Sequence, residues 1–519
     1  MDTGNVPSEL WMDIFELLPS PSDLYSITQT CKRFHALAVR AIHRHVIWRS
    51  ARQVENNLPV WNFHQGMDVT IHTLELGVSV RPPAVPDNLP VPTNPPLWPF
   101  QPVNHPMAFA LRLHNTISYH RLDLERFSSQ TLHAAMLQRI FTFVNLHKLV
   151  FSNVIFSDDH FAIIHALPQL RTLRIDHCIM PSPHQLQQYD HATLPITDLI
   201  LLNWRRQVSE HHGEVLVEED MTPVLNLALA QNLHTLRVDS TADVFRYVFH
   251  WHIDAQAPLN DIPPHLERLY VQRKQLLQPS VPGESTFPDT SLYSFLQRAH
   301  TLTTYSTFHP APQHQHLMPD TLPLLRCYSG PVESIAGILP GRPLEAVQLL
   351  SCVHGQSGVH NHRDGIPALT AVAEESPELL MLSVEFSTWD DEIMHAICAL
   401  FPKLRRLKIT YEGAGPSELT MVTMGPEFLS RLPDLHTLQL FTLSNEGGSR
   451  LKYPAYLFDP SYESVEEEMR NLVIPWNRWC PALREVQLAS GYTLLRGFTG
   501  GYWQIQRLKR AEEIEEFYY

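Results

Sequence analysis

A short apolar phrase recurs along most of the chain. In Leu404–Ile409, for example, apolar residues occupy the first, fourth and sixth positions, so the last two alternate with polar residues. Alternation with a period of two predicts a short strand that places its apolar side chains on one face. Further copies are Ile71–Leu76, Tyr119–Leu124, Leu146–Phe151, Leu170–Ile175, Ile196–Leu201, Leu233–Val238, Leu266–Val271, Leu302–Thr307, Leu344–Leu349, Leu379–Val384, Leu435–Leu440 and Leu483–Leu488, with Leu322–Cys327 as a weaker member.

Amphipathic helical segments separate the predicted strands. Ser128–Val144, Ser157–Leu167 and Trp389–Phe401 carry apolar residues at helical spacing. Five strands follow a Pro-x-Leu step, in which the proline ends the helix and turns the chain into the strand. The central leucines 122, 149, 173 and 199 are 27, 24 and 26 residues apart, the spacing of leucine-rich repeats. The fold class is therefore α/β, a solenoid with parallel strands inside and helices outside.

The first forty-odd residues have a different, purely helical pattern. Leu10, Ile14, Leu17 and Leu18 form an apolar stripe at positions i, i+4, i+7 and i+8, and Ser8 is placed to cap this helix. So short a segment cannot bury enough apolar surface to be stable alone. We therefore expect its remaining apolar face, which includes Trp11 and Phe15, to pack on a partner or on the rest of the chain.

This segment resembles an F-box, the helical module that docks substrate receptors onto a Skp-type adaptor in cullin-RING ubiquitin ligases. The resemblance rests on the Pro-x-Glu-Leu start, Ile14-Phe15, Leu17-Leu18-Pro19, Asp23-Leu24 and Cys31-Lys32-Arg33-Phe34. The alternative is an ordinary helical cap of the larger domain. If the resemblance holds, the residues that it implies for adaptor binding are Pro7, Leu10, Ile14, Phe15, Leu17, Pro19 and Leu24.

The remaining segments complete the predicted organisation. Arg81–Pro106 contains ten prolines and is expected to form a polyproline-like surface loop, and the His-rich stretches 309–319 and 351–365 are also expected to be loops. We expect Ser461–Trp479 to be an amphipathic helix and Tyr502–Phe517 a last helix that caps the array.

The predicted domains are 1–48, an F-box; 49–118, an entry repeat with the proline-rich loop; 119–460, the leucine-rich-repeat array; and 461–519, the terminal repeat and cap. The helix–proline–strand order resembles the degenerate leucine-rich arrays of fungal F-box proteins.

Composition narrows the class of protein. The 519 residues carry a net charge of −15, which disfavours binding to nucleic acid or to an anionic membrane. The six cysteines are scattered without a CxxC pair, as in reduced proteins of the cytoplasm or nucleus. The N-terminus lacks a signal-peptide pattern, and no apolar run reaches the length of a membrane span.

Motifs for chemistry are missing from the sequence. Nucleophile-elbow, dinucleotide, Walker-type, zinc-protease and kinase signatures do not occur. The strongest histidine cluster, around Cys352, His354, His360 and His362, has no second cysteine, and loop histidines in solvent explain it better than a metal site. We therefore expect no cofactor, no metal and no catalytic activity.

Binding residues are expected between the strand leucines, where side chains face away from the core. The candidates for target binding are Arg174, Arg237, Arg268, Tyr270, Arg406 and Lys408. Cations gathered on one face of an acidic chain suggest an acidic or phosphorylated target. The resulting hypothesis is a substrate-recognition subunit of an SCF-type cullin-RING ubiquitin ligase. Its partners would be a Skp-type adaptor, through it cullin and RING subunits, and an unknown protein target. The alternative is a leucine-rich-repeat scaffold that does not promote degradation.

Overall fold

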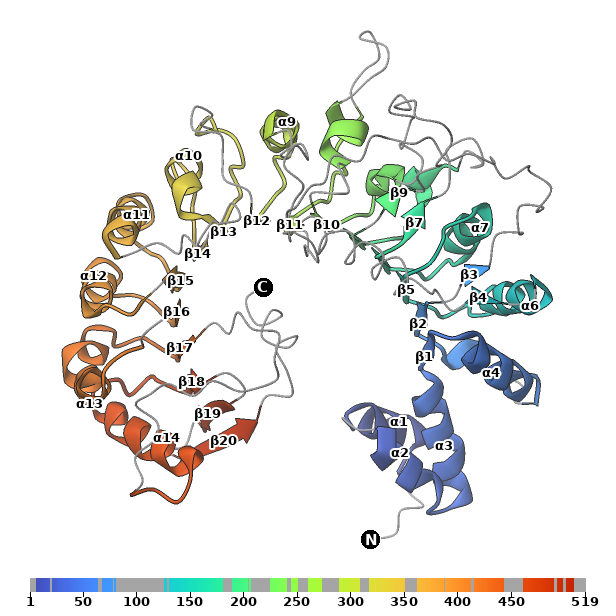
Figure 1. Ribbon diagram of the computed structural model, residues 1–519, viewed down its shortest axis with the longest axis horizontal. Helices are drawn as coiled ribbons and strands as arrows, with labels where there is room; N and C mark the ends of the chain where they lie inside the picture. Colours follow the sequence, from blue (N-terminus) through green and yellow to red (C-terminus); the bar gives the residue numbers. More distant parts are fainter. Residues whose placement is uncertain are drawn as a thin grey trace, which may run out of the picture. The chain divides into compact units, whose positions relative to one another are not determined.

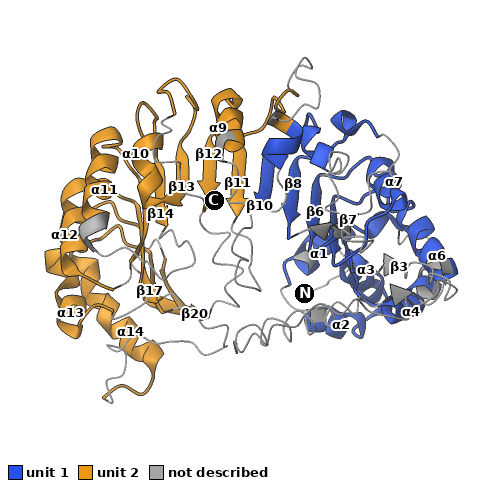
Figure 2. Ribbon diagram, turned by 45° about the horizontal axis from the view of Figure 1, so that its top comes forward, with its two compact units in different colours: residues 1–248 blue, residues 249–519 orange. Residues whose placement is uncertain are grey.

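The computed structural model describes the chain in segments that form two compact units, residues 1–248 and 249–519 (Figure 2). Each unit is described by itself. The described residues are 6–18, 21–63, 68–77, 79–80, 126–127, 130–180, 189–203, 205–206, 225–239, 244–250, 260–272, 289–308, 317–350, 362–386, 388–411, 415–442, 461–489, 492–497 and 501–507.

Three helices open the first unit, namely α1 (Ser8–Glu16), α2 (Pro21–Thr28) and α3 (Lys32–His43). Phe15, Leu24, Leu37 and Ala38 are buried between them. Pro7, rather than Ser8, is the N-cap of α1, and Ser8 is the first helical residue, so the predicted side-chain cap does not form. Arg33 of α3 instead fixes this end of α1, because its guanidinium donates to the carbonyl oxygen of Val6 at 2.5 Å.

Six parallel strands follow in the first unit, in the order β1-β2-β5-β6-β8-β10. The central leucines of four repeats, Leu149, Leu173, Leu199 and Leu236, lie side by side in register and are fully buried. The strands are β1 (His45–Trp48), β2 (Thr73–Leu76), β5 (Lys148–Ser152), β6 (Thr172–Asp176), β8 (Asp198–Leu202) and β10 (Thr235–Asp239), with the short pairs β3 (Ser79–Val80) and β4 (Arg126–Phe127), and β7 (Ile179–Met180) and β9 (Arg205–Arg206).

The second unit contains eight parallel strands and ends in an antiparallel hairpin. Here too one apolar residue of each repeat pairs with its counterpart on the next strand, for example Leu382 with Leu407 and Leu407 with Leu438. The strands are β11 (Arg268–Gln272), β12 (Thr304–Thr307), β13 (Cys327–Pro331), β14 (Ala346–Leu350), β15 (Met381–Phe386), β16 (Arg406–Tyr411), β17 (Thr437–Thr442), β18 (Glu485–Ala489), β19 (Tyr492–Arg496) and β20 (Trp503–Arg507).

Helices cover one side of the strands within each unit (Figure 1). We call the other side the open face. The other α-helices of the two units are α4 (Ala51–Phe63), α6 (Gln130–Ile140), α7 (Asp158–Ala166), α9 (Asp289–Arg298), the single turn α10 (Ile335–Ile338), α11 (His362–Glu375), α12 (Asp391–Leu400), α13 (Glu418–Glu427) and α14 (Val465–Val473). Short helical turns occupy Asp68–Thr70, His191–Thr193, Asn226–Leu229, Phe245–His250, Val332–Ser334, Leu429–Arg431 and Ile474–Arg478.

The chain enters most of the parallel strands through one repeated backbone contact. The carbonyl oxygen of Leu380 accepts from the N–H groups of Arg405 and Arg406, and the carbonyl oxygen of Arg405 accepts in the same way from His436 and Thr437. This contact fixes the register of neighbouring repeats without using side chains.

Most predicted elements are confirmed. The helices expected at 128–144, 157–167 and 389–401 correspond to α6, α7 and α12, and the parallel strands follow the apolar phrases. The helix expected at Ser461–Trp479 is α14 followed by a 3-10 turn, because Pro475 has no N–H to continue the α-helix. Several predicted segments lie outside the described residues, namely the phrase Tyr119–Leu124 and the proline-rich loop Arg81–Pro106. Of the two His-rich loops, only residues 317–319 and 362–365 are described.

Two predictions about elements of the repeat array are wrong. The weak phrase Leu322–Cys327 is shifted by three residues, because Tyr328 and not Leu325 pairs with the central Tyr305 of the previous strand. The last helix, expected to start at Tyr502, begins as strand β20, which pairs antiparallel with β19. Trp503 is buried while Gln504 is exposed, an alternation that suits a strand at the edge of a sheet.

Candidate functional site

One face of α1 exposes three large aliphatic side chains. Leu10, Ile14 and Leu17 are 52%, 44% and 82% exposed, and their spacing of four and three residues puts them on the same face of the helix. Together they form what we call the α1 strip. Exposed aliphatic side chains aligned in this way are typical of a surface that packs against a partner.

The opposite face of α1 is used inside the module. The ring of Trp11 lies 4.7 Å from that of Phe34, and Phe15 meets Phe34 edge-to-face at 5.5 Å. Phe15 is 2% exposed and Leu24 is also buried. These two predicted adaptor residues therefore belong to the core of the module, and the Trp11–Phe15 face packs on the chain itself. Pro7 is exposed just before α1, and Pro19 lies outside the described residues.

The open face of the first unit carries Arg174 in an ion pair. Its guanidinium donates to the carboxylate of Asp176 at 2.7 Å, and His177 Nδ1 lies 2.7 Å from the other carboxylate oxygen. The side-chain amide of Asn203, on the next repeat, donates to the same carboxylate at 3.2 Å. Burial opposes ionisation of Asp176, but the hydrogen bonds from His177, Arg174 and Asn203 outweigh it and hold its pKa well below the ordinary value.

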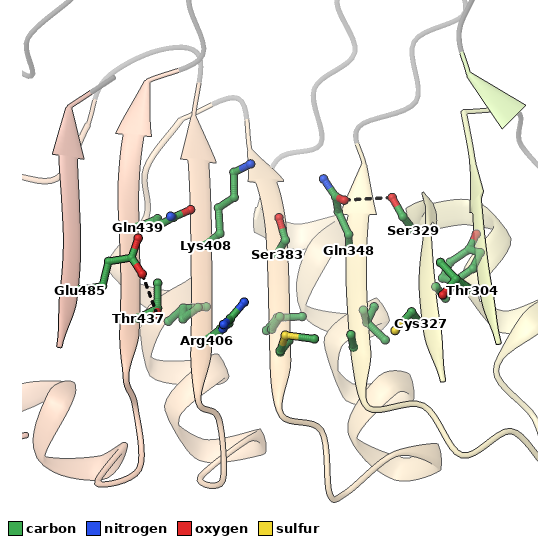
Figure 3. Close-up of a pocket in the computed structure, with 16 residues that line it drawn as sticks. Thr304, Cys327, Ser329, Gln348, Ser383, Arg406, Lys408, Thr437, Gln439 and Glu485 are labelled. Carbon is green, nitrogen blue, oxygen red and sulfur yellow. Dashed lines mark hydrogen bonds between the residues drawn. The ribbon is translucent and has the colours of Figure 1, made fainter. Parts of the chain in front are cut away.

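The open face of the second unit contains a groove across seven strands, β12 to β18 (Figure 3). Two rows of side chains line it, because residues two apart on a strand face the same side. The first row is Thr304, Cys327, Ala346, Met381, Arg406, Thr437 and Glu485, and the second is Ser329, Gln348, Ser383, Lys408 and Gln439.

Hydrogen bonds order part of this lining. The hydroxyl of Ser329 bonds to the side-chain oxygen of Gln348 at 3.0 Å, and that of Thr437 to Glu485 at 3.3 Å. Lys408 lies over the ring of Phe441, 5.5 Å from its centre. Burial raises the pKa of the Cys327 thiol, so this cysteine is a neutral lining group at neutral pH.

The six predicted target-binding residues do not form one cluster. Arg406 and Lys408 lie two residues apart in the groove, whereas Arg268 and Tyr270 are on β11, five strands away in the same unit. At about 4.8 Å per strand, that separation is roughly 24 Å. Tyr270 is buried. In the first unit, Ile200 on β8 separates Arg174 from Arg237.

Sequence reasoning missed the uncharged lining of the groove. Met381, Ser383 and Gln348 are ordinary in the sequence, and only the register of β14, β15 and β16 brings them beside Arg406 and Lys408. Aligning the repeats on their central leucine would have placed all five in two rows. An alignment of the repeats with one another would therefore have revealed the groove lining, whereas the residue types alone do not.

Two further properties concern the described residues. They contain no group of three His, Cys, Asp or Glu side chains able to hold a metal ion, and Cys352, His354 and His360 lie outside them. Nor does any helix in the described segments combine the length and apolar character needed to cross a bilayer.

Comparison with known proteins supports the helical module. Residues 3–50 match the family model described as F-box-like. The chain carries an F-box-like domain. The match covers the segment that forms α1, α2 and α3, and F-box domains generally bind Skp-type adaptors. A search of curated protein sequences found no match.

Solved leucine-rich-repeat structures resemble the chain distantly. A TLR13–ssRNA13 complex is 12% identical with a TM-score of 0.28, covering 68% of this chain and 41% of that one. The LRR ectodomain of the plant membrane receptor kinase GASSHO1/SCHENGEN3 from Arabidopsis thaliana, in complex with Casparian strip integrity factor 2, is 13% identical with a TM-score of 0.23, covering 59% and 34%. This chain thus spans less than half the length of either. Because both scores are low, the solenoid fold rests on the strand order of the chain itself.

Proposed function

We propose that the chain is the substrate-recognition subunit of an SCF-type ubiquitin ligase. Its F-box-like domain would bind a Skp-type adaptor and through it cullin and RING subunits, and its repeats would hold a protein target. The chain would be non-catalytic, since its role is to keep target and ligase close together, which raises their effective concentration.

The α1 strip is the observation that carries this proposal. It belongs to the segment that matches the F-box-like model, and it exposes Leu10, Ile14 and Leu17 while the other face of α1 forms the module core. Burying a Leu or Ile side chain contributes about 1.5–3 kcal/mol, so three of them can supply a substantial part of a binding energy.

The adaptor role predicts that charges in the α1 strip abolish binding. We would measure the affinity of the full chain for a Skp-type adaptor by surface plasmon resonance, comparing wild type with Ile14→Asp/Leu17→Asp. Both positions are exposed, so the double variant is expected to fold and to lose adaptor binding by at least about a hundredfold.

Leu419→Asp/Val422→Asp is the matched control. Leu419 and Val422 are exposed aliphatic residues on α13, 72% and 63% exposed. This control should bind the adaptor as wild type does. Adaptor binding that survives in Ile14→Asp/Leu17→Asp, with melting curves showing both variants folded, would refute the assignment of the strip.

A further inference from the structure

The groove of the second unit combines three features that a flat polar surface would not have. Arg406 is exposed, and it makes no ion pair with any of the described residues. Cys327, Ala346 and Met381 form an apolar part of the first row on three neighbouring strands. Ser383 is 4% exposed and lines the groove, and its hydroxyl has no hydrogen-bond partner among the described residues.

The cationic part of the groove can hold one anionic group. Arg406 and Lys408 are two apart on β16 and therefore about 7 Å apart on the same face, so an anion between them can contact both. Ser383 is the direct neighbour of Lys408 on the adjacent strand, and its buried hydroxyl can donate to the same anion (Figure 3). A buried hydroxyl without a partner costs about 1–3 kcal/mol, which a bound acceptor would recover.

The other charges near the groove do not neutralise Arg406. Glu485 is the one carboxylate among the lining residues, and it lies two strands from Arg406 with Thr437 between them. At about 4.8 Å per strand this is roughly 10 Å, beyond an ion pair. Arg406 is therefore placed to receive a negative group that none of the described residues supplies.

The spacing of the apolar part suits an extended peptide. Met381 is one strand and Ala346 two strands from Arg406, at about 5 and 10 Å. In an extended peptide that crosses the strands, side chains two residues apart are about 7 Å apart on the same side. A side chain two residues from the anion would thus lie between Met381 and Ala346.

We propose that this groove recognises an extended peptide segment of the target in which an anionic side chain, carboxylate or phosphate, is two residues from an aliphatic one. The inference rests on the proposed function, because it names the kind of target that the receptor would hold. Arginine binds carboxylate and phosphate with paired hydrogen bonds, and Lys408 and Ser383 complete the contacts.

A peptide selection tests the proposal. The full chain, purified with a Skp-type adaptor, would be presented to a phage library of random decapeptides. Enriched sequences should carry Asp or Glu two positions from Leu, Ile, Val or Met, in one of the two orders. A library that yields no such pattern, from a chain that still binds its adaptor, would overturn the peptide proposal and leave the adaptor role intact.

Variants then tie the selected peptide to the groove. Fluorescence anisotropy with a fluorescein-labelled selected peptide should show Arg406→Glu weakening binding by at least about tenfold and Ser383→Ala by about threefold. Arg405→Glu is the matched control, since Arg405 is exposed, adjacent in sequence and outside the groove lining, and it should bind within about twofold of wild type.

The peptide itself supplies the remaining comparison. Replacing its acidic residue by Gln should reduce binding as strongly as Arg406→Glu does, and phosphoserine at that position should retain binding if the pocket accepts phosphate as well as carboxylate. Placing Lys there should restore part of the binding to Arg406→Glu. Equal affinity of the Glu and Gln peptides, or of wild type and Arg406→Glu, would contradict the proposed anion site.

Discussion

Arg174 and Asp176 form an ion pair of 2.7 Å at the open face of the first unit, whereas Arg406 in the second unit makes no ion pair with any residue that the structure describes. Arg174 directly follows the central leucine of its repeat, Leu173, whereas Arg406 directly precedes that of its own repeat, Leu407. The Arg174 guanidinium is bound by the carboxylate of Asp176, whereas Arg406 lines the groove. Sign of charge alone therefore does not select the residues that contact a target.

Replacing Asp176 should destabilise the first unit more than replacing Arg174. Asp176 is buried and accepts bonds from Arg174 and Asn203, while the Arg174 side chain is 42% exposed. We expect Asp176→Asn to lower the free energy of unfolding by about 1–3 kcal/mol and Arg174→Ala by less than about 1 kcal/mol, as measured in urea.

The lowered pKa of Asp176 makes its contribution to the free energy of unfolding depend on pH. In the unfolded chain the pKa of this carboxyl group is about 3.9. The Asp176 carboxylate therefore stabilises the folded unit fully above that pH, and this stabilisation is lost as the pH falls through the lower pKa of the folded state. Equal effects of the two substitutions at pH 7 would contradict the role assigned to the buried carboxylate.

The sequence was sufficient to predict the strands and their faces. Period-two leucines decide which side chains enter the core, and this depends on local order alone, as the register of Leu382, Leu407 and Leu438 confirms. The shifted repeat at Tyr328 and Gly330 was missed because a tyrosine and a glycine do not stand out as an apolar phrase.

The sites depend on packing that the sequence does not state. The stripe predicted on α1 mixed outward and inward residues, and only the packing of Phe34 on Trp11 and Phe15 separates the exposed Leu10 and Ile14 from the core. In the groove, residues from strands tens of positions apart become neighbours through register. Charge and residue type could not show which arginine was already paired.

Stability of the first unit should fall between pH 7.5 and pH 5 through His160. This side chain is buried on α7, and burial first, with nearby His133 second, lowers its pKa from 6.5 to about 3. The unfolded chain therefore binds more protons below pH 6.5, so stability is lost as the pH falls. At pH 5 the loss from His160 alone should be about 2 kcal/mol.

His160→Asn provides the comparison for this effect. Nδ1 of His160 accepts a hydrogen bond from the backbone N–H of Ser157 at 3.1 Å, and the side-chain oxygen of Asn can accept in its place. Chemical denaturation of both proteins at several pH values should give a steeper decline for wild type. Parallel declines would mean that other histidines, which both proteins share, cause the pH dependence.

Removing the hydroxyl of Ser383 should not destabilise the second unit. This hydroxyl is buried and finds no hydrogen-bond partner within the described segments, so Ser383→Ala is expected to leave the free energy of unfolding unchanged or to raise it by up to about 1 kcal/mol. Ser329→Ala is the control and should lower it by about 1 kcal/mol, because it removes the 3.0 Å bond to Gln348. A larger loss in Ser383→Ala than in Ser329→Ala would mean that Ser383 holds the fold together.

Deleting the terminal cap should make the second unit aggregate. Met469, Trp476 and Cys480 are buried, and the thiol of Cys480 donates to the backbone oxygens of Leu432 and Leu435 at 3.3 Å. A chain ending at residue 460 loses these contacts, at about 1.5–3 kcal/mol per uncovered apolar side chain. Analytical ultracentrifugation should show aggregates, whereas a chain ending at Arg507 should stay monomeric. A monomeric 1–460 fragment with a sharp melting transition would contradict the role of the cap.

Recovery of cullin with the chain tests the central claim most directly. Cells would express tagged wild type, Ile14→Asp/Leu17→Asp or Leu419→Asp/Val422→Asp, and quantitative mass spectrometry would measure adaptor, cullin and RING subunits in each purification. We predict all three with wild type and with the α13 control, and none with the α1 variant. Recovery of the adaptor without cullin from wild type would instead identify a scaffold outside the ligase and contradict the account.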